Sequence, residues 1–243
     1  MEVWGLTDPG LVRAQNQDYY LTMRLSKTAL ACVVCDGMGG AKSGNVASKL
    51  AAEVFFDELK RSYRPELEPD RICNLLNTAV TIANTAVYEN SLLSPDMNGM
   101  GTTLVAAVLT GKRAYFANVG DSRAYLLNGD GVKRITVDHS LVELMVQRGE
   151  LTQEQAKSYP GKNFITRAVG TEPTIECDTF TQDLKSGDCI LLCTDGLTNQ
   201  LADQELLFEV VHGVHKSDCC RRLINIARDR GAPDNVTAVL IAC

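Results

Sequence analysis

Short apolar runs, most of them bounded by glycine or polar turn residues, dominate the hydrophobic pattern of this chain. Runs of this length, rich in apolar and β-branched residues, are typical of strands. They occur from one end of the sequence to the other. The pattern predicts strands over about 1–8, 17–24, 28–35, 102–110, 113–119, 122–127, 132–136, 175–181, 188–194 and 236–242.

Longer segments, in which apolar residues recur every three to four positions, alternate with these runs and predict helices. The first begins after Gly44 and continues to about Arg61. The second follows a loop at 64–69, with Asp70 as its N-cap, and Ser217 is the predicted cap of the last. The expected helices are about 44–61, 70–87, 203–212 and 217–229, with short helices at about 140–148 and 152–157.

Three short turns separate the central strands: Gly111-Lys112, Gly120-Asp121 and Gly129-Asp130-Gly131. Turns this short favour antiparallel pairing of the strands that they join. Each predicted helix has one apolar face, which has to cover a sheet. We therefore predict an α+β sandwich with sheets inside and helices outside, in a single domain over residues 1–243. A mixed three-layer α/β fold stays open on spacing alone.

The composition is that of a globular protein, with 45% hydrophobic and 22% charged residues among 243 and a formal net charge of −6. An acidic chain lacks the basic footprint of nucleic-acid binding. No apolar run approaches the ~20 residues of a membrane span, and the N-terminus lacks the apolar stretch of a signal peptide. We expect a cytoplasmic protein with neither nucleic-acid nor membrane partners. The sequence contains no coiled-coil pattern, which favours a monomer.

The nine cysteines are an odd number, and several lie inside strand-like runs. Cys32 and Cys35 have the spacing of a zinc-binding pair, but they lie within an apolar run and no second such pair follows. Cysteines of this kind in a cytosolic protein are usually reduced core residues.

Aspartates adjoin the ends of three apolar runs, at Asp36-Gly37, Gly120-Asp121 and Asp195-Gly196. Taken alone, each Asp-Gly or Gly-Asp pair is an ordinary turn signal. Their number, and two further aspartates in dense polar motifs, Asp18 and Asp234, favour a shared site. Carboxylates crowded at one rim of a sheet repel one another unless divalent cations neutralise them. The pattern therefore predicts a centre for a metal-activated water.

An oxygen-only donor set suits Mg²⁺ or Mn²⁺. Arg13, five residues before Asp18, could hold a phosphate through a bidentate contact, although a lone loop arginine is more often solvated. The sequence lacks a phosphate-binding loop of the Gly-x-x-x-x-Gly-Lys type, a Gly-x-Gly-x-x-Gly motif and a Gly-x-Ser-x-Gly elbow. Nucleotide binding and serine-hydrolase chemistry are accordingly disfavoured.

Seven motifs occur in order along the chain and together carry a resemblance: Arg13-x-x-Asn16-Gln17-Asp18, Asp36-Gly-Met-Gly-Gly40, Gly101-Thr102-Thr103, Asn118-Val-Gly-Asp121-Ser-Arg123, Asp138-His-Ser140, Thr194-Asp195-Gly196 and Asp234-Asn-Val-Thr237. The chain resembles the bacterial branch of the metal-dependent protein phosphatases, the type 2C serine/threonine phosphatases. The resemblance runs from Trp4 to the last strand. It implies a four-layer α-β-β-α sandwich of two mainly antiparallel sheets flanked by helices.

The resemblance also implies a two-metal centre, with a role for each aspartate. Asp36 would bridge both ions, the Gly37 carbonyl would bind one of them, and Asp195 and Asp234 would bind the other. Asp18 would act mainly through metal-bound water.

The same resemblance implies that Asp121, with Asp195, would form a weaker third position. Arg13 would hold the substrate phosphate, so Arg13, Asp36 and Asp195 are the expected catalytic residues. The segment at about 141–170 would be a variable flap that influences substrate choice. Thr102 and Thr103 would support the site.

Four positions bear on how closely the site follows the family pattern. Gln17 stands where many members have glutamate, which removes one negative charge near the ions. Met38 and Ala41 stand where some members have histidine, so the proton donor for the leaving group is unassigned. His139 is a possible replacement acid, but a structural role is favoured.

Three hypotheses follow for function. The leading one is a phosphatase that hydrolyses phosphoserine and phosphothreonine in proteins by direct attack of water, opposing a serine/threonine kinase. The second is a pseudophosphatase that acts as a scaffold. The third is an enzyme dedicated to a single regulatory partner. The sequence leaves open the physiological substrates, the metal used and activity on phosphotyrosine.

Overall fold

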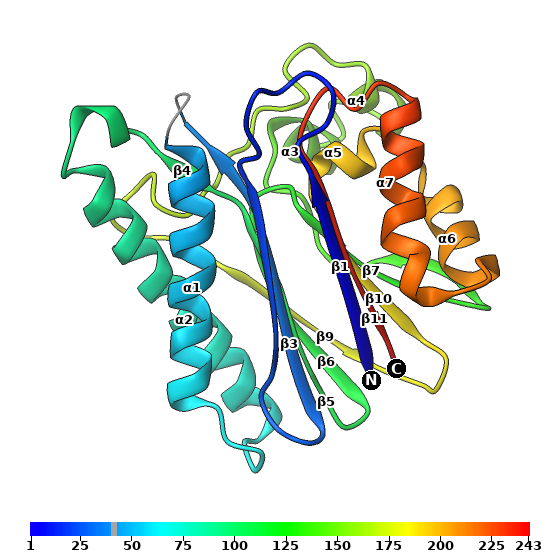
Figure 1. The fold of residues 1–243 in the computed structure, drawn as a ribbon. Helices are drawn as coiled ribbons and strands as arrows, with labels where there is room; N and C mark the ends of the chain where they lie inside the picture. The colour runs from blue at the N-terminus through cyan, green and yellow to red at the C-terminus, as the bar shows by residue number, and fades with distance from the viewer. Residues whose placement is uncertain (40–42) are drawn as a thin grey trace.

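The structure is a computed structural model that describes residues 1–39 and 43–243. Two β-sheets lie face to face, and a pair of helices covers the outer face of each (Figure 1). This arrangement confirms the four-layer α-β-β-α sandwich and excludes the three-layer alternative. Gly40 and Ala41, two positions named with the family resemblance, lie outside the described residues.

The first sheet has the strand order β1-β11-β10-β7-β8, and the second has the order β2-β3-β5-β6-β9, with β4 added beside β3. All the recorded strand pairs are antiparallel. β1 pairs with β11, so the two ends of the chain lie side by side (Figure 1). The strands are β1 (Glu2–Asp8), β2 (Asp18–Arg24), β3 (Ala29–Met38), β4 (Gly101–Thr102), β5 (Leu104–Thr110), β6 (Arg113–Val119), β7 (Arg123–Asn128), β8 (Gly131–Arg134), β9 (Asp178–Asp183), β10 (Cys189–Cys193) and β11 (Val236–Ala242).

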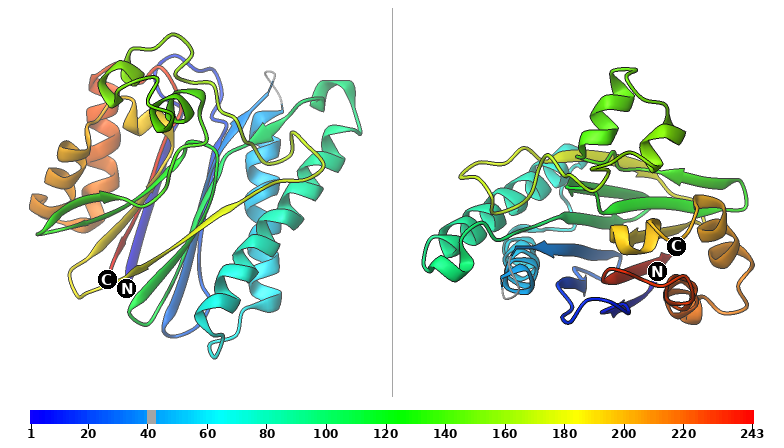
Figure 2. Two further views of the ribbon diagram at one scale, coloured as in Figure 1. Left: turned by 180° about the vertical axis from the view of Figure 1, so that it is seen from behind. Right: turned by 90° about the horizontal axis from the view of Figure 1, so that it is seen from above.

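Helices α1 and α2 cover the second sheet, and α6 and α7 cover the first (Figure 1). The flap, defined as residues 141–170, carries α3 and α4 and projects beyond one end of the sandwich (Figure 2). The helices are α1 (Gly44–Ser62), α2 (Pro69–Ser91), α3 (Leu141–Gln147), α4 (Gln153–Lys157), α5 (Asp195–Thr198), α6 (Asp203–His212) and α7 (Cys219–Asp229), with short 3₁₀ helices at Pro95–Met97 and Lys216–Asp218.

Three apolar cores separate the four layers, and successive strand residues alternate between them. In β3, Cys32 belongs to the core between the sheets, whereas Cys35 packs on the helix side. The two thiols therefore face opposite sides of the sheet and cannot share a zinc ion. All nine cysteines, each within the described ranges, are free, in agreement with the prediction of reduced residues.

Two predicted helix starts were wrong. Helix α2 has Glu68 as its N-cap and Pro69 in its first turn, so Asp70 lies inside the helix rather than capping it. Proline is well suited to a first helical turn because its missing N–H would be unpaired there anyway. The N-cap of α7 is Asp218, and Ser217 lies in the preceding 3₁₀ turn.

The Gly120-Asp121 turn also differs from the prediction. It does not close a hairpin, because β6 belongs to the second sheet and β7 to the first. Gly120 has a φ of +100°, and a Cβ there would lie 2.6 Å from the Thr103 side chain. The turn thus carries the chain from one sheet to the other. The remaining two short turns close antiparallel hairpins as predicted.

Candidate metal centre

The five predicted aspartates lie at the same end of the two sheets, and we refer to them together as the acidic rim. Asp18 begins β2 and pairs in register with Asp36 near the end of β3. Asp121 follows β6, Asp195 follows β10 at the start of α5, and Asp234 precedes β11. Antiparallel pairing explains the convergence, because the start of one strand lies beside the end of its neighbour.

Asp18 is the most deeply buried member of the rim, with 5% of its surface exposed. Its Oδ2 accepts hydrogen bonds from Thr194 at 2.9 Å and Thr237 at 2.7 Å. Its Oδ1 is buried and has no hydrogen-bond partner among the described residues. Burial raises the pKa of Asp18 to about 7, with further increases from Asp195 and Asp234, while the two threonine hydrogen bonds lower it. A buried, unpartnered carboxylate oxygen fits an environment completed by a cation.

The backbone of Asp36 is held by hydrogen bonds to Thr102 and Thr103. Its N–H donates to Thr103 Oγ1 at 2.9 Å, and its carbonyl accepts from Thr103 N and Thr102 Oγ1, both at 2.9 Å. The Thr103 hydroxyl also bonds to Ser122 at 2.7 Å. Burial raises the pKa of the Asp36 carboxyl, and Asp18 raises it further. Thr102 and Thr103 therefore support the site.

Gly37 lies where the end of β3 meets the start of α1. A Cβ on Gly37 would lie 2.0 Å from the carbonyl oxygen of Gly44, so the position has no room for a side chain. The Gly37 N–H donates to the carbonyl of Gln17 at 3.0 Å, and Ser48 donates to the same oxygen at 2.6 Å. These contacts set the position of the Gly37 carbonyl beside Asp36.

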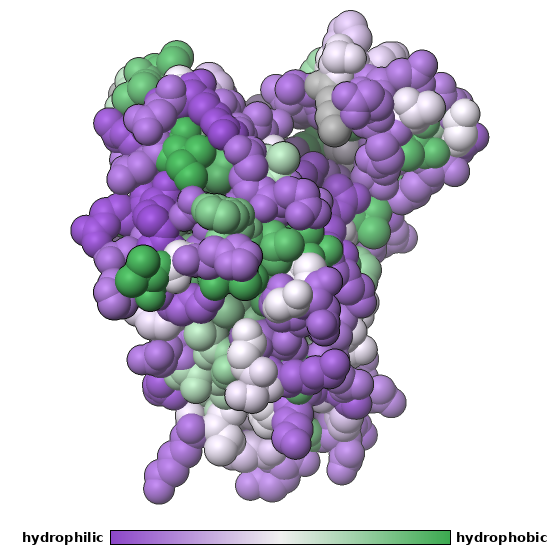
Figure 3. Space-filling view, turned by 90° about the vertical axis from the view of Figure 1, so that its right-hand side faces the viewer, coloured by the Kyte–Doolittle hydropathy of each residue, from purple (hydrophilic) through white to green (hydrophobic). Residues whose placement is uncertain are grey.

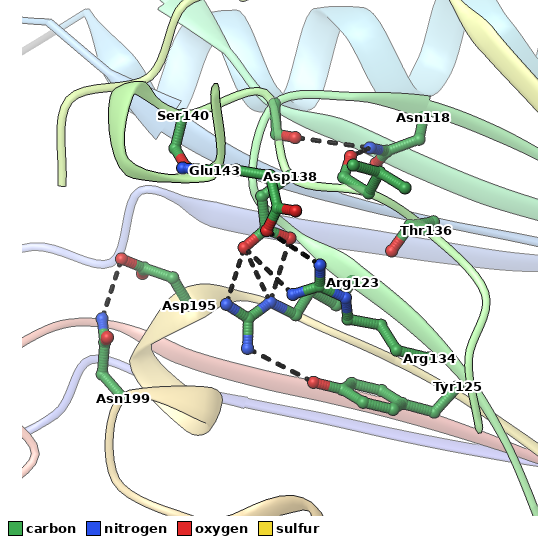
Figure 4. Close-up of polar contacts among 12 residues, drawn as sticks. Asn118, Arg123, Tyr125, Arg134, Thr136, Asp138, Ser140, Glu143, Asp195 and Asn199 are labelled. Carbon is green, nitrogen blue, oxygen red and sulfur yellow. Dashed lines mark hydrogen bonds and ion pairs between the residues drawn. The ribbon is translucent and has the colours of Figure 1, made fainter. Parts of the chain in front are cut away.

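Asp195 and Asp121 lie on the flap side of the rim. Burial and Asp234 raise the pKa of Asp195, whose Oδ2 accepts from Asn199 at 3.0 Å (Figure 4). Burial and then Asp195 raise the pKa of Asp121 to about 7, and Arg123 opposes this increase. Asp121 is therefore within reach of the charge of Asp195.

Arg13 donates to Asp234 Oδ2 at 2.8 Å, and its side chain is 57% exposed. The hydrogen bond to Asp234, and then the charges of Asp234, Asp36 and Asp195, raise the pKa of Arg13. Arg13 thus lies at the rim, as predicted. Its guanidinium is partly exposed and forms an ion pair with Asp234.

Asn235 fixes the loop that carries Arg13, a role that the sequence did not suggest. Its Oδ1 accepts from Gln17 N at 2.8 Å, and its Nδ2 donates to the carbonyls of Pro9 at 2.9 Å and Gln15 at 3.0 Å. The only sequence signal was its place in a dense polar motif beside Asp234.

His139 has the structural role that the sequence favoured. Its Nδ1 accepts from Gly120 N at 3.1 Å, and its Nε2 lies 3.2 Å from an oxygen of Asp178. Both ring nitrogens are thus occupied by the turn and by β9.

The donor set fits hard divalent cations, because it consists of carboxylate and carbonyl oxygens. Among the described residues, no three histidine, cysteine or acidic side chains are drawn together closely enough to form a ready-made metal site. The carboxylates of the acidic rim are near enough to raise one another's pKa values.

A cleft of about 660 Å³ opens beside the rim, between the flap and the start of α6. Its lining includes Asp121, Arg123, Asp138 and Asp195. In the space-filling view the upper end of the molecule is hollowed between two projections (Figure 3). A cleft of this size has room for more than a phosphate group.

The chain matches the family model described as protein phosphatase 2C over residues 12–240. It belongs to the protein phosphatase 2C family. The serine/threonine phosphatase Stp of Listeria innocua is 36% identical over 235 residues, which cover 97% of this chain and 93% of that protein.

Solved structures agree with this assignment. The phosphatase is similar to the serine/threonine phosphatase Stp1 of Staphylococcus aureus, with a TM-score of 0.94 and 34% identity over 100% of this chain and 94% of that one. It is similar also to the catalytic domain of the phosphatase PstP in complex with two manganese ions, with a TM-score of 0.84 and 33% identity over 98% and 96% of the two chains. The resemblance stated from the motifs is confirmed, and the protein is a metal-dependent serine/threonine protein phosphatase.

Proposed function

We propose that this phosphatase hydrolyses phosphoserine and phosphothreonine in proteins at the acidic rim, with two divalent cations as its cofactor. The observation that carries the proposal is the buried Oδ1 of Asp18, which has no partner among the described residues and lies among carboxyl groups with raised pKa values. Such a group is costly to bury unless a cation neutralises it.

Asp36 and the Gly37 carbonyl would hold one ion, and Asp36, Asp195 and Asp234 would hold the other. Asp18 would act through water, and Asp121 with Asp195 would hold a weaker third ion. Bound ions of this kind supply an activated water and neutralise the charge that develops on phosphorus. Manganese is favoured because the similar PstP structure contains two manganese ions, and Mg²⁺ is the alternative.

Arg13 would bind the phosphate of the substrate. Its guanidinium can hold two phosphate oxygens once it leaves Asp234, which is then available to a cation. Hydrolysis forms a bond from the water oxygen to phosphorus and breaks the bond from phosphorus to the serine or threonine oxygen, which takes up a proton. Met38 cannot donate that proton, and His139 is engaged with Gly120 and Asp178.

The substrates are phosphoproteins, as for protein phosphatases in general. The whole chain forms one catalytic domain in this proposal, with the flap as the part that faces the substrate. Opposition to a serine/threonine kinase, a monomeric state and a cytoplasmic location stay predictions of the sequence. No helix of the described residues is long and apolar enough to cross a membrane.

Hydrolysis of a phosphothreonine peptide tests the proposal, with Mn²⁺, with Mg²⁺ and with a chelator. Turnover should require the metal and should fall by at least about 10²-fold in Asp36→Ala, the order of loss typical when a main electrostatic group is removed. Asp130→Asn is the matched control, because Asp130 lies in the exposed β7–β8 hairpin. Metal-independent turnover, or full activity of the Asp36 variant, would refute the two-metal function; a folded, inactive wild type would favour the scaffold hypothesis.

A further inference from the structure

A chain of alternating charges joins Arg123, in the lining of the cleft, to the first helix of the flap (Figure 4). Arg123 Nε lies 3.0 Å from both carboxylate oxygens of Asp138. Arg134, at the end of β8, lies 3.6 Å from Asp138 and donates to Glu143 at 3.0 Å. Glu143 belongs to α3, so the Arg134–Glu143 pair crosses from the first sheet to the flap.

Polar contacts rather than a core hold α3 in place. All seven residues of α3 are described and none is buried. Its apolar residues Leu141 and Leu144 are each 37% exposed. Ser140 caps the helix by accepting from Glu143 N at 3.3 Å, and Leu141 N donates to the carbonyl of Phe164 at 2.8 Å. An element with so little buried apolar surface opens easily, so each polar contact to the sheet matters for its position.

The Arg134–Glu143 pair is better shielded than an ordinary surface pair. The two side chains are 26% and 13% exposed. A second pair on the flap, Arg148–Glu150, is separated by 4.0 Å, and its side chains are 70% and 49% exposed. Exposed pairs contribute little, because water and salt screen them. Arg134–Glu143 is therefore the better placed of these two pairs to fix α3, and Arg148–Glu150 serves as an internal control.

Arg134 and Glu143 line the same cleft as Asp121 and Asp195. A phosphorylated segment that reaches the acidic rim through this cleft has to pass between the flap and the start of α6. We propose that the Arg134–Glu143 pair is a latch that holds the flap where the cleft accepts a phosphoprotein segment. This inference rests on the proposed function. Both are positioning residues: they set affinity for the protein substrate, while the chemistry stays at the rim.

Kinetics of latch variants on a phosphothreonine peptide form the first test. Arg134→Gln and Glu143→Gln should each raise KM by up to about fivefold, the limit set by losing about 1 kcal/mol, because fewer molecules hold the flap in the competent position. The turnover number should change less than twofold. The double variant should be no worse than Arg134→Gln, because that variant already removes the Arg134–Glu143 interaction. Glu150→Gln on the exposed pair should leave KM unchanged.

Hydrogen exchange of the α3 amides in metal-free protein gives a readout that does not depend on catalysis. Exchange should be several-fold faster in Glu143→Gln than in the wild type or in Glu150→Gln. Equal exchange and equal KM in latch and control variants would overturn the latch. An inactive wild type would refute the proposed function instead, and the exchange comparison would still decide whether the pair fixes the flap.

Discussion

At the scale of single residues, Asp18 combines near-complete burial with one carboxylate oxygen that has no partner among the described atoms. Its pKa of about 7 means that the charged form, which predominates above neutral pH, is less favourable in the folded protein than in the unfolded chain. The proposed role of Asp18 depends on that charge. The same charge lowers the free energy of unfolding of the protein when no cation is bound. A variant that removes the charge of Asp18 should therefore be more stable without metal and less active with it.

Asp18→Asn should make the metal-free protein more stable at pH 8, by up to about 4 kcal/mol, since three pKa units correspond to about 4 kcal/mol. The same variant should gain less stability from Mn²⁺ than the wild type and should hydrolyse phosphopeptide more slowly. Denaturant unfolding with chelator and with Mn²⁺ measures the first two quantities. A metal-free variant no more stable than the wild type would contradict the account of the rim.

Asn235 acts on Arg13 through the loop rather than by contact. Asn235→Ala removes three hydrogen bonds to backbone groups of residues 9–17 and should lower the free energy of unfolding by about 2–4 kcal/mol. The KM for phosphopeptide should rise as the loop loosens. A free energy of unfolding and a KM equal to those of the wild type in Asn235→Ala would contradict this role.

At the scale of elements, the end of β3 and the start of α1 are packed backbone to backbone. Gly37→Ala would place a methyl group 2.0 Å from the Gly44 carbonyl, so it should lower the free energy of unfolding by more than about 2 kcal/mol and weaken the Mn²⁺-dependent rise in Tm. Gly129→Ala is the matched control, because no described atom lies within 4 Å of a Cβ there. A Gly37→Ala variant with the same Tm as the wild type would show that the fold does not require the close contact between Gly37 and the Gly44 carbonyl.

The sequence predicted most elements because each apolar run or periodic stretch packs on a core of its own. It missed the path of the chain at Gly120, since a two-residue turn looks the same whether it closes a hairpin or crosses between sheets. The sites of Asp18, Asp36 and Arg13 were predicted from motifs. The hydrogen bonds of Asn235, Thr194 and Thr237 join positions more than 40 residues apart, and no local pattern encodes such contacts.

At the scale of the whole molecule, the acidic rim makes metal-free stability depend on pH. The pKa values of Asp18 and Asp121 are about 7 in the folded protein, above the ordinary value of 3.8, so the folded state binds more protons than the unfolded state between these values. The free energy of unfolding should therefore fall as pH rises from about 4 to 7. Urea unfolding with chelator at several pH values measures it, and the Asp18→Asn variant should show a shallower fall. Stability that rises over this range would contradict the account.

The most direct test of the central claim is an anomalous difference map from crystals grown with Mn²⁺. The account predicts two strong peaks at the acidic rim, one within coordination distance of Asp36 and the Gly37 carbonyl, the other within coordination distance of Asp36, Asp195 and Asp234. Manganese peaks elsewhere, with none at the rim in crystals of a protein that shows Mn²⁺-dependent turnover, would contradict it.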